Sequence, residues 1–159
     1  MNTSAYQAVI NIPDRRSGFA LGLRCNRDEI LAIEFLAPRA AQAPKLPLAQ
    51  EAVRQLRAYL KDSRFQFGLP LAPAGTPFQR RVWEGIAAIP SGETRTYGAL
   101  AQSINSAPRP VCGANPYAVV VPCHRVVASG GLGGFGGERD GLSLQIKRWL
   151  LAHEDAQWR

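Results

Sequence analysis

The segment 114-ANPYAVVVPCHRVVASGG-131 places a thiol and an imidazole side by side, at the point where an apolar run ends. A cysteine attacks as its thiolate, and a neighbouring histidine can accept the thiol proton. A carboxylate on the far side of the imidazole would orient the ring. Because adjacent residues of an extended chain point to opposite faces, Cys123 and His124 can cooperate only if the chain turns after Pro122. The alternative is a buried, unreactive cysteine beside a histidine that takes no part in chemistry.

The composition indicates a packed globular protein with a polyanionic partner. Hydrophobic residues make up 46% of the 159 residues and charged residues 19%, which argues against a disordered chain. The net charge of +7 arises from 19 Lys and Arg against 12 Asp and Glu, and most of the cations are arginine. Because arginine suits bidentate phosphate contacts, nucleic acid is the first candidate partner and an anionic membrane the second. A basic protein without such a partner is the alternative.

The sequence pattern also favours a reducing compartment. No run approaches the roughly eighteen apolar residues of a membrane span, and the N-terminus lacks a basic flank followed by an apolar core. The three cysteines, Cys25, Cys112 and Cys123, have no C-x-x-C spacing, which favours free thiols. With His124 and His153 as the only histidines, we expect no structural metal. We therefore expect a cytoplasmic protein that does not contact membranes.

The first half of the chain predicts a small sheet followed by a helix. Residues 5–36 contain three apolar stretches separated by turn signals. Residues 48–61 have apolar side chains at helical spacing. The proline- and glycine-rich connector 68-GLPLAPAG-75 then marks a boundary.

The second half predicts helices around the cysteine segment. Thr76 has the features of a helix N-cap with Pro77 at the first helical position, and Thr96 opens a second helix. Two helices joined by a turn in a basic protein fit a helix-turn-helix. Valines 119–121 indicate a brief buried strand or extended run, and residues 142–154 an amphipathic helix.

Together these elements predict an α/β fold of the α+β kind with two domains. Residues 1–73 would form a small N-terminal domain of sheet and helix. Residues 74–159 would form a mostly helical C-terminal domain with the helix-turn-helix and the active-site cysteine.

Several motifs, taken together with their order along the chain, resemble those of the alkylguanine-DNA alkyltransferases, also called methylated-DNA–protein-cysteine methyltransferases. The most specific is 122-PCHRV-126, preceded by Asn115-Pro116 and an apolar run. The others are 76-TPFQRRVWEGIAAIPSGETRTYGALA-101, the glycine-rich loop through Gly133-Gly134-Phe135, and the closing 147-KRWLLAHE-154. The resemblance covers residues 76–154, whereas the preceding part resembles the family's variable N-terminal domain in layout only.

The resemblance implies a catalytic role for five residues. Cys123 would be the alkyl acceptor, His124 its base through a bridging water, and Glu154 the carboxylate that orients His124. Asn115 would form the hinge between the recognition helix and the active-site strand. Tyr97 would help to rotate the target nucleotide and to deliver a proton to the leaving guanine.

The remaining matching residues would bind DNA or line the substrate pocket. Arg109 would fill the gap left by the flipped base, and Thr96, Tyr97 and Arg125 would also contact DNA. The pocket would lie between residues 116–119 and the segment that follows the cysteine, with these lining residues: Pro116, Val126, Ser129, Leu132, Gly133 and Phe135.

The implied reaction is an irreversible displacement that needs no cofactor and no metal. The thiolate attacks the alkyl carbon on guanine O6, guanine leaves, and a thioether remains on Cys123. The nucleotide must first be extruded from the duplex, at a cost of roughly a few kcal/mol. The expected partner is double-stranded DNA containing O6-alkylguanine, read through the minor groove. We expect a monomer, because one molecule repairs one lesion. If the chain is bacterial, we expect it to be associated with the nucleoid.

Two other functions fit parts of the pattern. An alkyltransferase-like lesion-binding protein would recognise the damage without removing it, but it carries another residue, often tryptophan, in place of Cys123. A cysteine hydrolase built on Cys123, His124 and Glu154 would turn over many substrates.

One segment departs from the family pattern. The stretch 109-RPVCGAN-115 is about three residues, nearly one helical turn, shorter than usual. Since Pro110 disfavours helical geometry at Arg109, we expect the recognition helix to be shortened or replaced by a loop.

Overall fold

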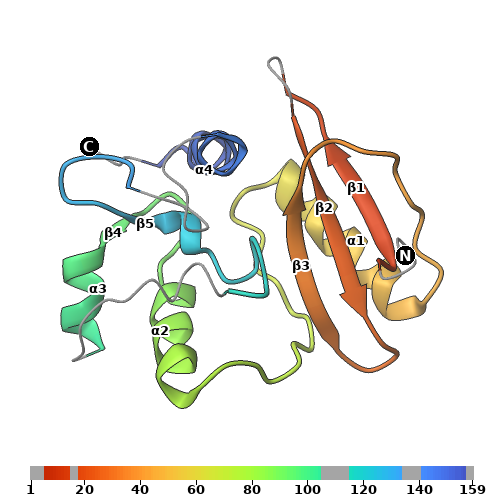
Figure 1. Ribbon diagram of the computed structural model, residues 1–159, viewed down its shortest axis with the longest axis horizontal. Helices are drawn as coiled ribbons and strands as arrows, with labels where there is room; N and C mark the ends of the chain where they lie inside the picture. The colour runs from red at the N-terminus through yellow and green to blue at the C-terminus, as the bar shows by residue number, and fades with distance from the viewer. Residues whose placement is uncertain (1–5, 15–17, 105–114, 134–140, 157–159) are drawn as a thin grey trace. The chain divides into compact units, whose positions relative to one another are not determined.

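A computed structural model describes residues 6–14, 18–104, 115–133 and 141–156, which fall into two compact units (Figure 1). The first unit comprises residues 1–73 together with 116–118, and the second comprises residues 74–115 and 119–159. The expected α+β combination of a small sheet with helices is confirmed. Within the described residues, none of the helices combines the length and the apolar character needed to span a bilayer.

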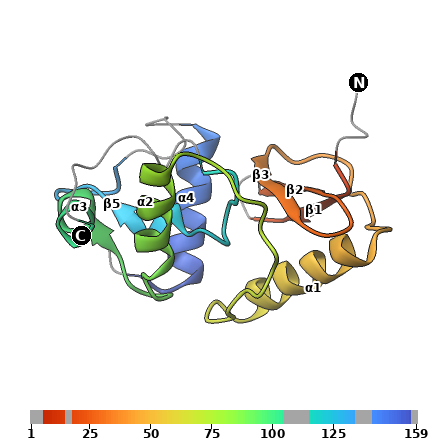
Figure 2. The same ribbon diagram turned by 90° about the horizontal axis from the view of Figure 1, so that it is seen from below.

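The first unit consists of an antiparallel sheet and one helix. The strands β1 (Ala8–Ile12), β2 (Phe19–Cys25) and β3 (Ile30–Leu36) pair in chain order. Helix α1 (Pro47–Lys61) lies against one face of this sheet (Figure 2). Its buried side chains recur at helical spacing: Ala49, Ala52, Val53, Gln55, Leu56 and Tyr59. The three strands and the helix predicted from the sequence are therefore confirmed.

The free edge of β3 is occupied by two segments from elsewhere in the chain. The Ile33 N–H donates to the Pro116 carbonyl at 2.8 Å, and the Ala118 N–H donates to the Ile33 carbonyl at 3.1 Å. Ile30 pairs with residues 70–72 in the same way. These bonds satisfy an edge that would otherwise be open to other chains. Pro116, predicted to line the substrate pocket, thus belongs to this sheet edge.

The second unit is mostly helical. Helices α2 (Pro77–Ala87), α3 (Tyr97–Ser103) and α4 (Leu142–His153) accompany a two-stranded parallel sheet of β4 (Arg95–Thr96) and β5 (Val126–Val127). Apolar side chains from α2, α4 and β5 are buried in its core: Val82, Trp83, Ile86, Val126, Leu144, Ile146, Leu150 and Leu151. Helices α2 and α4 contact the turn that contains Cys123, and β5 follows that turn directly.

Helices α2 and α3 begin where the sequence predicts. The Thr76 hydroxyl accepts from the Gln79 N–H at 3.1 Å, and the Gln79 side chain accepts from the Thr76 N–H at 2.9 Å. This reciprocal capping box precedes Pro77 at the first helical position. Thr96 caps α3 by accepting from the Ala99 N–H at 3.1 Å. The two helices contact each other, as in a helix-turn-helix, while the segment around Arg109 lies outside the described residues.

The strand predicted at valines 119–121 is wrong. Residues 118–120 form a turn in which Val119 has a positive φ of 71°. The physical reason is Asn115, whose side-chain Nδ2 donates to the Val121 carbonyl at 2.9 Å and closes the chain on itself. An extended strand would separate these two residues by roughly 20 Å. The strand comes later, at β5, after the cysteine.

Removal of the α2 cap should destabilise the second unit. We expect Thr76→Ala to lower the free energy of unfolding by about 1 kcal/mol. The Gln79 N–H loses its acceptor, the Thr76 hydroxyl, and the reciprocal capping box is broken. Urea unfolding followed by circular dichroism measures this change. Thr76→Ser keeps the hydroxyl acceptor and is the matched control. Equal stability of the alanine variant and the parent would contradict a capping role.

Candidate functional site

Cys123 begins a short 3-10 turn, Cys123–Arg125, directly before β5. The Cys123 N–H donates to the Val121 carbonyl at 2.8 Å, and the Arg125 N–H donates to the Pro122 carbonyl at 2.9 Å. This is the tight turn after Pro122 that cooperation between the thiol and the imidazole requires. Both side chains are buried, since Cys123 is 4% exposed and His124 1%. Neither Cys123 nor Cys25 forms a disulfide.

His124 contacts a carboxylate at the C-terminal end of α4. Its Nε2 lies 2.8 Å from Oε2 of Glu154, the residue that ends α4. The Glu154 side chain is completely buried, so α4 delivers a carboxylate into the protein interior. The structure thus brings together the imidazole and the carboxylate that the sequence motif predicts.

Arg125 occupies the other side of the same carboxylate. Its Nε lies 2.8 Å from Oε1 of Glu154 and one terminal nitrogen lies 2.9 Å from Oε2, while the other donates to the Ile89 carbonyl at 2.7 Å. The Arg125 side chain is only 11% exposed. The family resemblance implies that Arg125 contacts DNA, but the structure places its guanidinium in this interior cluster. The bidentate, charge-assisted contact with Glu154 offsets the cost of removing both charges from water.

Lys147 is a second interior cation that the sequence analysis missed. It is fully buried in α4, and its Nζ donates to the Val126 carbonyl at 2.8 Å. Residues 147, 150, 151 and 154 share one helical face, and Leu150, Leu151 and Glu154 are buried as well. Lys147 precedes Glu154 by two helical turns on this face, and that position is the signal in the sequence that could have revealed its burial.

The surroundings keep His124 neutral. Burial lowers the pKa of His124 below 6.5, its ordinary value, and the charges of Arg125 and Lys147 lower it further, against the opposing effect of Glu154. A carboxylate paired with arginine only accepts hydrogen bonds, so the proton between His124 and Glu154 belongs to Nε2. The other ring nitrogen, Nδ1, is buried and has no hydrogen-bond partner among the described residues. His124 therefore presents a lone pair at Nδ1 that can accept a proton.

Tyr97 lies beside the glycine-rich segment that follows the cysteine. Gly133 has a positive φ of 76°, and a Cβ at this position would lie 3.1 Å from the Ala128 nitrogen and 3.5 Å from the Tyr97 ring. Only glycine fits this conformation without strain. Thr96, which caps α3, is half-buried next to Tyr97. The predicted tyrosine and glycine are thus neighbours in space.

The other predicted residues are more scattered. Asn115 forms the loop-closing bond to Val121 described above, and Val126 and Leu132 are buried. Ser129 is exposed at a turn. The remaining predicted residues, Arg109 and Phe135, lie outside the described residues, as does Cys112.

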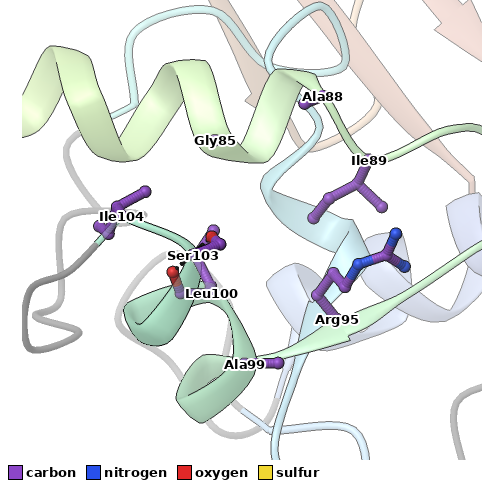
Figure 3. Close-up of a pocket in the computed structure, with 8 residues that line it drawn as sticks. All are labelled: Gly85, Ala88, Ile89, Arg95, Ala99, Leu100, Ser103 and Ile104. Atoms are coloured by element: carbon purple, nitrogen blue, oxygen red, sulfur yellow. Dashed lines mark hydrogen bonds between the residues drawn. The ribbon is translucent and has the colours of Figure 1, made fainter.

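A pocket of about 390 Å³ lies between the end of α2, β4 and α3 (Figure 3). Its lining residues are Gly85, Ala88, Ile89, Arg95, Ala99, Leu100, Ser103 and Ile104. None of these is a predicted site residue. One lining residue, Ile89, also contacts the cysteine turn, because its carbonyl accepts a hydrogen bond from Arg125.

The described part of the chain holds no group of three or more metal-ligating side chains. What the interior does provide is a thiol next to a neutral histidine, a carboxylate behind that histidine, and two cations. These groups suit nucleophilic attack by sulfur with proton transfer to an imidazole.

Comparisons with known proteins agree with this chemistry. The model of the 6-O-methylguanine DNA methyltransferase DNA-binding domain matches residues 77–156. A protein of Acanthamoeba polyphaga mimivirus, named as a probable methylated-DNA–protein-cysteine methyltransferase, is 39% identical over 133 residues, 79% of this chain and 82% of its own. The methylated-DNA–protein-cysteine methyltransferase of Methanosarcina acetivorans is 46% identical over 111 residues, 66% of this chain and 68% of its own.

The fold is also similar to a solved structure. The crystal structure of Mycobacterium tuberculosis OGT in complex with DNA superimposes with a TM-score of 0.71 at 34% identity, over 92% of each chain. Sequence and structure agree over most of the length, and the resemblance based on the PCHRV segment is confirmed. The chain therefore belongs to the methylated-DNA–protein-cysteine methyltransferase family.

Proposed function

We propose that this protein repairs DNA by transferring the alkyl group of O6-alkylguanine in duplex DNA to its own Cys123. It is a methylated-DNA–protein-cysteine S-methyltransferase that acts once. The proposed transfer itself requires no cofactor, because the thiol attacks the alkyl group directly. The observation that carries the assignment to Cys123 is the interior contact of His124 with Glu154, 2.8 Å apart, in the turn that begins at the cysteine. Relatives named for methylated DNA and protein cysteine support the same reaction.

The transfer is a displacement at the alkyl carbon. The thiol proton of Cys123 passes through a bridging water to Nδ1 of His124, while the Nε2 proton stays in the bond to Glu154. The sulfur forms a bond to the alkyl carbon as the bond from that carbon to guanine O6 breaks. Guanine leaves with the electron pair, and the Tyr97 hydroxyl assists its protonation. The imidazolium produced is stabilised by the carboxylate of Glu154.

DNA is the partner of this chain, which agrees with its basic charge of +7 and with the DNA complex of its M. tuberculosis neighbour. We propose that residues 74–159 form the DNA-binding and alkyl-transfer domain, with Arg109 filling the gap left by the flipped nucleotide. Thr96 and Tyr97 are proposed to contact the DNA. Residues 1–73 would form the N-terminal domain. A monomer in the reducing cytoplasm suits a single-use thiol.

The substrate pocket is proposed to form around the cysteine. Gly133 supports this proposal because its lack of a side chain lets both Ala128 and Tyr97 approach the backbone at this position. Val126, Ser129, Leu132 and Phe135 would complete the wall on the side that follows the cysteine.

The alternative of a lesion-binding protein without transfer activity is not favoured, because Cys123 is present and lies beside a histidine–glutamate pair. A cysteine hydrolase with the same three residues would differ in stoichiometry, since it would release its product and act again.

The proposal predicts the transfer of one methyl group per protein molecule. We expect incubation with duplex DNA containing O6-methylguanine to add one methyl group to the peptide that holds Cys123, as measured by intact mass and peptide mapping. Cys123→Ser is the control and should gain no mass. Binding of the lesion without mass gain would support a lesion-binding protein, and repeated turnover would support a hydrolase. Either result contradicts the proposal.

The neutral state of His124 predicts a pH dependence of stability. Below pH 6.5 the unfolded chain takes up a proton at His124 that the folded chain does not bind, because burial lowers the pKa of this residue in the fold. The free energy of unfolding should therefore fall by up to about 1.4 kcal/mol per pH unit below that value. Urea unfolding between about pH 7 and pH 5.5 measures the slope.

The comparison variant is His124→Gln, which should show a smaller fall than the parent over the same range. His153→Gln keeps His124 in place and should retain the full fall. If the His124 variant and the parent have the same slope, His124 is not buried in its neutral form.

A further inference from the structure

The 3-10 turn Cys123–Arg125 presents two neighbouring side chains to one buried carboxylate. His124 approaches Oε2 of Glu154 through Nε2, and Arg125 engages both oxygens at 2.8 and 2.9 Å. The third contact of the guanidinium is the Ile89 carbonyl at 2.7 Å, in the turn after α2. Arg125 is therefore fixed at three points and cannot rotate away from Glu154 without leaving a buried carbonyl unsatisfied.

The contact between His124 and Glu154 alone allows two arrangements, and the second holds one proton more than the first, taken up from solvent. In the first, an ionised Glu154 accepts from Nε2–H, and Nδ1 keeps its lone pair. In the second, a neutral Glu154 donates to Nε2, and the ring carries its proton on Nδ1 instead. Only the first arrangement leaves a base that can receive the proton of Cys123.

Burial by itself favours the second arrangement, because an unpaired carboxylate in an apolar interior becomes neutral. A guanidinium that grips both oxygens reverses this preference, since it is permanently charged and interacts only with the ionised form. Lysine could not reproduce the planar, two-pronged contact.

We propose that Arg125 is a positioning residue for alkyl transfer: it keeps Glu154 ionised and oriented, and thereby holds His124 as the Nε2–H tautomer with Nδ1 free to act as the base. The inference rests on the proposed function of Cys123 and His124. Arg125 touches neither the alkyl group nor the thiol in this role, and it acts through Glu154.

The other charged group at His124 is Lys147 on α4, which acts on the ring together with Glu154 and Arg125. Its Nζ donates to the Val126 carbonyl, a backbone group of β5. Lys147 is therefore kept unchanged in the test below, so that any change in the imidazole is due to Arg125.

The test combines nitrogen-15 NMR of the imidazole with single-turnover kinetics. The parent should show the Nε2–H tautomer of His124, assigned by comparison with His124→Gln. We expect Arg125→Met to shift His124 toward the Nδ1–H tautomer and to slow methyl transfer by about 100-fold near neutral pH, as expected for a lost general base. Part of the rate should return as the pH rises, because Glu154 then ionises without help. A merely structural role would change neither the tautomer nor the shape of the pH profile.

Two further variants separate the contributions. Arg125→Lys keeps the charge and should retain most of the Nε2–H tautomer, with a rate between those of the parent and Arg125→Met. Arg54→Met removes an equally bidentate but exposed pair with Glu51 on α1, and should change neither readout.

The proposal is overturned if Arg125→Met keeps the Nε2–H tautomer, whatever happens to its rate. It is also overturned if the parent itself holds the Nδ1–H tautomer, a measurement that needs no variant and so does not depend on how Arg125→Met folds. Because the spectra do not require any transfer, they test Arg125 separately from the alkyl-transfer assignment.

Discussion

The carboxylate of Glu154 has to be compensated inside the protein, because removing an ion from water costs roughly several kcal/mol even after relaxation. Helix α4 ends at this residue and delivers it to the turn that contains Cys123. His124 and Arg125, adjacent in sequence, share its two oxygens. The geometry of the turn, the end of α4 and the ionisation of the histidine therefore depend on one buried ion pair.

The segment before the cysteine is held by one side-chain bond and by backbone contacts. Asn115 closes a loop onto Val121, and the residues between them include the sheet-edge contacts of Pro116 and Ala118 with Ile33 in the first unit. The chain thus enters the turn at Cys123 from a conformation that has little freedom. A nucleophile benefits from such preorganisation, since less reorganisation is needed to reach the reactive geometry.

Local signals in the sequence predicted most of the fold. The cap residues Thr76 and Thr96 mark the starts of α2 and α3, and the histidine–glutamate contact followed from the family motif. An error arose where a side-chain hydrogen bond, and not the apolar pattern, decides the conformation. The bond between Asn115 and Val121 converts an apparent valine strand into a turn.

Charged side chains were harder still. Arg125 was expected to contact DNA because of the family resemblance, whereas its burial depends on Glu154, 29 residues away in the chain. Lys147 received no role from the sequence, yet its side chain lies in the interior.

The measurement that tests the account most directly is the single-turnover rate of methyl transfer by Glu154→Gln, with its affinity for lesion-containing DNA measured on the same preparation. We predict a rate about 100-fold below that of the parent at unchanged affinity, because the histidine loses the carboxylate that orients it. An unchanged rate would contradict the account, since Cys123 would then be activated without the buried ion pair.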